Sequence, residues 1–232
     1  RSIFCARVGS STLTITNGAF KASNVTVTAA VTVSGTLTIT GNSTVNRILI
    51  GTSTTAAQPP GTSKTITCNG PVTCPAGDFM DITGAGSASW DLSAITGGSG
   101  DAQGNSGITF TTAAAQTRSG AGGNYSTAAS WTSRVPLPQD DVTIDSGASG
   151  TISGDMPRLG KTITFTGFTG TYDDTVAQSV YGTLTLASGM TFSSNQTWAF
   201  LGRSTYTLTP SGKTFARCWP ILMPDGIMRF GI

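Results

Sequence analysis

Short runs in which threonine alternates with an aliphatic residue recur along this chain at a nearly constant spacing. The run TLTIT at Thr12–Thr16 returns at Thr36–Thr40, and Ser188–Phe192 returns in similar form as Ser211–Phe215. Alternate residues of a strand face opposite sides, so each run has one aliphatic and one threonine face. A period of about 23–24 residues accommodates three short strands and three turns, which predicts a stack of similar coils.

We therefore predict an all-β fold, specifically a right-handed parallel β-solenoid with about 23–24 residues per coil and an irregular central excursion. Aliphatic side chains would stack inside the coils, and threonines would form ladders outside. Glycine and asparagine would supply the corners. The alternative is an antiparallel β-sandwich, because Asn-Gly pairs such as Asn17-Gly18 also mark hairpins.

The composition excludes several classes of protein. Charged residues make up only 10% of the chain, the net charge is +2, and all 11 acidic residues are aspartate. There is no histidine, so this chain cannot supply a histidine base or metal ligand. The low charge gives no nucleic-acid surface, and no apolar run is long enough to span a membrane. We expect no cofactor and no metal site.

The sequence divides into segments by regularity. Residues 1–116 are expected to form a first solenoid-like segment with a loop-rich part at 51–107, and 141–215 a second segment. Residues 117–140, which are rich in glycine and aromatic residues, would connect the two. Residues 216–232 are apolar and contain no serine or threonine, which fits a cap or a continuation into a longer protein.

The most distinctive segment is Asn124–Ile144. It combines an aromatic loop around Trp131, a Val-Pro turn, the pair Asp140-Asp141 and a strand of the Val-x-Ile kind. It resembles a segment of β-solenoid surface proteins of the phage tail-fibre or spike type and of bacterial adhesins. The chain departs from that pattern at Tyr125, where tryptophan is usual, and at Arg118, where an apolar residue would be natural.

This resemblance implies a structural or receptor-contacting segment of a larger virion or cell-surface protein, located on a virion or outside the cell. A bacterial adhesin that binds glycans is one alternative, and a polysaccharide-degrading spike is another. The partners that the resemblance implies are two further copies of the chain in a homotrimer and a cell-surface glycan.

Aspartates are the candidates for chemistry if the chain is an enzyme. Asp140, Asp141 and Asp145, with Arg134 and Arg158, could line a groove, and a pair of carboxylates about 5–9.5 Å apart would suit glycoside hydrolysis. The competing interpretation is that these aspartates cap turns, and it is the one we favour. An enzyme activity is therefore not the primary expectation.

Three other features are candidate sites. Thr36, Thr38 and Thr40, with Trp131, are candidates for contact with a ligand. A regular threonine array could also match a repeating lattice, which leaves ice binding as a further alternative. Cys68 and Cys74 flank a short turn and could form a disulfide in an oxidising setting.

Overall fold

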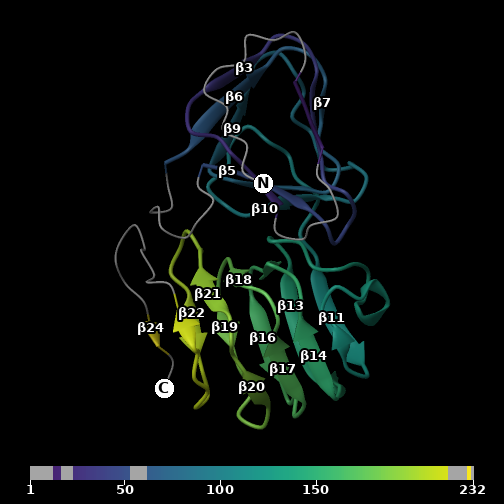
Figure 1. Cartoon of the computed structure of the whole chain (residues 1–232), viewed down its shortest axis with the longest axis vertical. Helices are drawn as coiled ribbons and strands as arrows, with labels where there is room; N and C mark the ends of the chain where they lie inside the picture. The colour runs from purple at the N-terminus through teal and green to yellow at the C-terminus, as the bar shows by residue number, and fades with distance from the viewer. Residues whose placement is uncertain (1–12, 17–22, 53–61, 219–228, 231–232) are drawn as a thin grey trace. The chain divides into compact units, whose positions relative to one another are not determined.

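The computed structural model describes residues 13–16, 23–52, 62–218 and 229–230 (Figure 1). This part of the chain is all-β, as predicted, and its one helical element is the 3-10 turn η1 (Ala128–Ser130). Every pair of its named strands runs parallel. The antiparallel sandwich is therefore wrong for these residues, whose only antiparallel contact is an isolated bridge between Arg118 and Trp131. None of these residues belongs to a helix long and apolar enough to cross a membrane.

The chain divides into two compact units, Arg1–Thr112 and Ala113–Ile232. The predicted boundary at residue 116 lies close to this division. The predicted connector 117–140 contains most of β11 (Ala115–Gly120) and all of β12 (Gly123–Asn124), and both strands pair within the second unit. Most of the predicted C-terminal segment 216–232 lies outside the described residues.

The first unit contains three parallel sheets, and the strands enter them in rotation. The first sheet holds β1 (Leu13–Thr16), β4 (Leu37–Thr40) and β7 (Val72–Thr73). The second holds β2 (Ser23–Thr26), β5 (Ile48–Gly51), β8 (Gly77–Met80) and β10 (Ser99–Asp101). The third holds β3 (Val31–Val33), β6 (Lys64–Cys68) and β9 (Ile82–Ala85).

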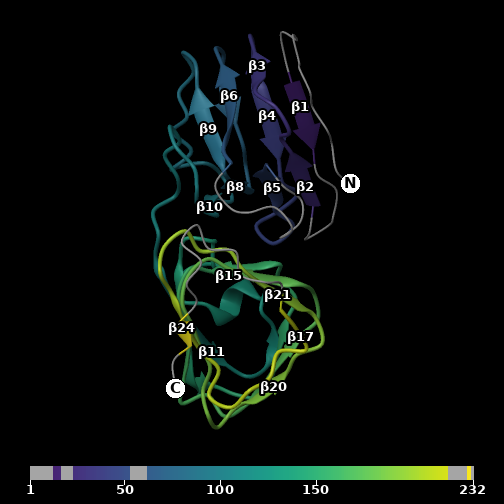
Figure 2. The same cartoon turned by 90° about the vertical axis from the view of Figure 1, so that its left-hand side faces the viewer.

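The second unit repeats this plan, and Figure 2 looks along its stacked strands, which run around a common centre. Its first sheet holds β11, β13 (Asp141–Ala148), β16 (Ile163–Thr166), β19 (Leu184–Thr185), β22 (Thr207–Thr209) and β24 (Arg229–Phe230). The second sheet holds β12, β14 (Thr151–Gly154), β17 (Thr171–Asp174) and β20 (Thr191–Ser193). The third holds β15 (Arg158–Gly160), β18 (Gln178–Val180), β21 (Thr197–Phe200) and β23 (Arg217–Cys218).

The strand register explains the sequence repeat. Leu13 pairs with Leu37, as the TLTIT recurrence predicts. In the second unit Ile163 pairs with Leu184, which lies closer in the sequence than one predicted period. In the first unit Leu37 pairs with Val72, which lies farther away than one period. The predicted period thus holds for some pairs only, because the connections between strands vary in length while the strands stay short.

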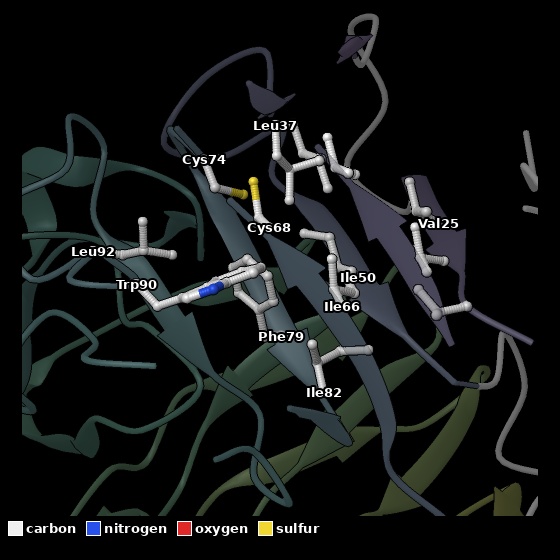
Figure 3. Close-up of a cluster of buried hydrophobic side chains, with 14 of the residues drawn as sticks. Val25, Leu37, Ile50, Ile66, Cys68, Cys74, Phe79, Ile82, Trp90 and Leu92 are labelled. Atoms are coloured by element: carbon white, nitrogen blue, oxygen red, sulfur yellow. The ribbon is translucent and has the colours of Figure 1, made fainter. Parts of the chain in front are cut away.

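Alternation of buried and outward residues builds both interiors. On β3, Val31 and Val33 are buried while Thr32 between them is exposed. Figure 3 shows the resulting cluster of the first unit, which includes Val25, Leu37, Ile50, Ile66, Phe79, Ile82, Trp90 and Leu92. In the second unit Phe192 and Phe215, which are equivalent in the sequence repeat, pack edge to face with ring centroids 5.0 Å apart. Burial of these aliphatic and aromatic side chains is the main favourable term in folding.

Candidate functional site

The outward threonines of the first sheet in the second unit stand in register. Three successive strands, β16, β19 and β22, contain the buried residues Ile163, Leu184 and Leu208, and a threonine lies directly before and after each of them. Ile163 pairs with Leu184, and Leu184 pairs with Leu208. We call the six residues Thr162, Thr164, Thr183, Thr185, Thr207 and Thr209 the threonine array, and all six are half-buried. The column through Thr164 continues to Thr143 and Thr117 on the neighbouring strands.

The predicted contact residues of the first unit form a shorter version of this arrangement. Thr38 pairs with Thr14 on one side and Thr73 on the other, and Thr40 pairs with Thr16. Thr36, Thr38 and Thr40 are half-buried. In the described residues the column through Thr38 spans three strands. The sequence alone had pointed to this shorter array rather than to the longer one.

Trp131 is an end cap rather than a ligand platform. Its side chain is only 6% exposed, and its indole Nε1 donates to the carbonyl of Tyr125 at 2.7 Å. The ring packs edge to face on Tyr125, with centroids 4.7 Å apart, and the Arg118 guanidinium lies over it at 5.9 Å. The prediction that Trp131 contacts a ligand is therefore not supported, because the indole is buried over the edge of the sheet.

Asp140 is completely buried, and its carboxylate is fully engaged. Both of its oxygens receive the Arg134 guanidinium, with Nη2 at 2.6 Å and Nε at 3.2 Å. The backbone N–H groups of Leu137 and Ala114 also donate to it, each at 2.8 Å. A carboxylate with four donors and no exposure fixes the turn into β13 and has no lone pair left for a substrate proton.

The remaining acidic candidates do not converge. Asp141 and Asp145 both point outward from β13, at positions about 13 Å apart along the strand. A pair of catalytic carboxylates needs about 5–9.5 Å. Asp145 Oδ1 also accepts the N–H of Gly147 at 2.8 Å, as a turn cap. Arg158 is buried on β15, in a different sheet. The predicted groove is therefore not assembled by these residues.

No group of three or more His, Cys, Asp or Glu side chains in the described ranges could hold a metal ion. The predicted disulfide is not formed in the structure, where Cys68 and Cys74 are both buried free thiols. Their sulfur atoms point toward each other in Figure 3. Cys68 Sγ donates to the carbonyls of Gly35 and Gly70 at 3.3 Å, and burial raises the pKa of the Cys74 thiol far above its ordinary value.

The sequence analysis missed a buried ion pair in the first unit. Arg47 is 2% exposed and Asp78 is fully buried, and Arg47 Nη2 lies 2.6 Å from Asp78 Oδ1. The same guanidinium donates to the carbonyls of Gly77, Gly97 and Gly98 at 3.0, 2.6 and 3.0 Å. Arg47 thus joins the corners before β5, β8 and β10. The feature of the sequence that could have indicated this pair is the position of Arg47, directly before the aliphatic run Ile48–Ile50.

Three of the four buried tyrosines make the fold sensitive to alkali. Burial raises the pKa of Tyr125 and Tyr172 well above the ordinary value and that of Tyr206 to about 12. The hydroxyl of Tyr125 donates to the carbonyl of Leu159 at 2.6 Å, and that of Tyr172 donates to Gln178 Oε1 at 3.1 Å. These bonds require the neutral phenol.

We expect the free energy of unfolding to fall as the pH rises from about 10, the pKa of an unfolded tyrosine, through about 12. The raised folded pKa means that this stabilisation is complete below the unfolded pKa and is lost above it. Tyrosinate absorbance and far-UV circular dichroism, recorded together, should therefore change in one step. Full ionisation of the tyrosines with an intact β spectrum would contradict the prediction.

Comparison with known proteins gives the chain no relative: it matches no protein-family model, no curated protein and no solved structure.

Proposed function

We propose that both units are coils of a right-handed parallel β-solenoid, and that the chain serves as a stiff structural segment of a larger surface or virion protein. The observation that supports this most directly is the rotation of strands through three sheets, so that each of β16, β17 and β18 pairs with the third strand after it. Backbone hydrogen bonds then run along the whole stack and make it rigid.

Side-chain chemistry is consistent with a structural role. Asp140 caps a turn, as described above, and Asp155 does the same by accepting the N–H and hydroxyl of Ser126 at 2.9 and 2.6 Å. Buried tyrosines and aromatic clusters fill the interior of the second unit. The resemblance of Asn124–Ile144 to segments of phage tail fibres, spikes and adhesins favours a virion or a cell surface as the setting.

Two measurements test the proposal. Amide hydrogen exchange should be slowest in β16, β17 and β18, whose strands are paired on both sides, and equally fast exchange in these strands and in the loops would overturn the solenoid assignment. Incubation with bacterial surface polysaccharides should release no new reducing ends. Depolymerisation that is abolished by Asp141→Asn or Asp145→Asn would instead establish the enzyme alternative, because both aspartates point outward and asparagine keeps an oxygen that can accept the Gly147 N–H.

A further inference from the structure

The threonine array is a repeating surface. Neighbouring strands of a sheet are about 4.8 Å apart, and residues two positions apart on one strand are separated by about 6.6 Å. The strands β16, β19 and β22 lie side by side (Figure 1). Their threonines, with Thr162 and Thr183 directly before β16 and β19, therefore form a grid of hydroxyl and methyl groups, two across and three deep. Thr143 extends one column of the grid, and the other column is flanked by charged residues, Asp141, which directly precedes Val142 on β13, and Arg229, which pairs with Thr207.

The hydroxyls of this grid are held in place. Threonine is branched at Cβ and has few rotamers, and side-by-side packing in a ladder restricts it further. The Oγ1 of Thr183 also accepts the backbone N–H of Thr207 at 3.3 Å, which ties one strand to the next. A hydroxyl restricted in this way would hold a bound water molecule at a defined position.

The chemistry of the array selects among ligands. It contains no charged side chain, which would hold its own hydration shell, and no aromatic ring on which a sugar could stack. Phe165, Tyr172 and Trp198, which lie in the same unit, are buried. Rows of hydroxyls at these two repeats resemble rows of water oxygens in an ice lattice. The ligand that fits is therefore ordered water, and not a polysaccharide or a charged polymer.

A second threonine ladder in the same unit provides an internal comparison. Thr151, Thr171 and Thr191 are in register on β14, β17 and β20. The adjacent column contains Asp173 between Ser153 and Ser193, so a charge interrupts the grid. This ladder has the same residue type and strand spacing as the threonine array. It has one column of threonines instead of two, and its neighbouring column carries a charge.

We infer that the threonine array is an ice-binding face that adsorbs to ice through the water ordered by its two columns of hydroxyl and methyl groups. This activity is independent of the structural role proposed above, since a stiff segment can lack it.

The test is partition of the full chain into a slowly growing ice hemisphere, with thermal hysteresis measured in parallel. We expect the unmodified protein to enter the ice and to shape the crystals. Thr185→Lys, at the centre of the array, should reduce incorporation to that of an inert protein. The matched control Thr171→Lys, at the centre of the second ladder, should leave incorporation unchanged. Circular dichroism and the melting temperature of both variants check that the fold survives.

Exclusion of the unmodified protein from ice would overturn the inference, and so would equal losses in the two lysine variants. Binding of the protein to microcrystalline cellulose or chitin that is lost in Thr185→Lys, without incorporation into ice, would assign the face to a crystalline polysaccharide instead. A trimer that dissociates in Thr185→Lys would assign it to contact between copies of the chain.

Discussion

Asp78→Asn is expected to lower the free energy of unfolding of the first unit by about 3–5 kcal/mol, because the Arg47 guanidinium would remain buried without an anion. The substitution conserves shape and removes only the charge. The cost is large because neither side chain can reach water: Arg47 is 2% exposed and Asp78 is fully buried. Chemical denaturation followed by circular dichroism measures the change.

Asp91→Asn is the matched control, since Asp91 lies in the same unit with its side chain in solvent and caps Ser93. It should have a much smaller effect. The double variant Arg47→Met with Asp78→Leu should recover only part of the loss, because the carbonyls of Gly77, Gly97 and Gly98 would lose their donor. A loss below about 1 kcal/mol for Asp78→Asn, the size of an exposed pair, would show that the pair is solvated.

Asp174→Ala is expected to destabilise the second unit by at least about 3 kcal/mol, because several buried hydrogen-bond donors would lose their acceptor at once. Trp198 Nε1 donates to Asp174 Oδ2 at 2.7 Å, and the backbone N–H groups of Asn195 and Gln196 donate to Oδ1 at 2.5 and 3.0 Å. Asp174 is 2% exposed, so water cannot replace these bonds. Denaturant unfolding monitored by tryptophan fluorescence would report the loss.

The adjacent residue supplies the control. Asp173 has the same side chain on the same strand but points outward, in line with Ser153 and Ser193. Asp173→Ala should therefore change stability by only a few tenths of a kcal/mol, as is usual for surface substitutions. If the two variants were equally unstable, the inward orientation of Asp174 would be incorrect.

Alternation and repetition were sufficient to predict the all-β class, because burial of every second residue is what a strand with one solvent face requires. The TLTIT recurrence even predicted the pairing of Leu13 with Leu37. The spacing could not predict that Ile163 and Leu184 pair across a shorter stretch of chain, or Leu37 and Val72 across a longer one. Connections of different length join strands of similar length, so a single period cannot describe the chain.

The sequence pattern did not predict which charged residues are buried. Asp140 was a candidate for chemistry beside the favoured interpretation of a turn cap, and its oxygens accept from Arg134 and two backbone N–H groups. Neither Arg47 nor Asp174 was predicted to be buried, although both are centres of buried hydrogen bonds. Amphipathic reasoning assigns charges to the outside, and the alternation of residues does not show which charges find a partner inside.

Part of the outer edge of β11 is covered by residues that follow it in the chain. Trp131 forms an isolated β-bridge with Arg118. Thr132 binds both backbone groups of Thr117: its N–H donates to the Thr117 carbonyl at 3.1 Å, and its hydroxyl accepts the Thr117 N–H at 3.2 Å. An incoming strand cannot pair with these two residues in the middle of β11. A fibre built by adding further chains strand to strand would therefore meet an obstacle at β11.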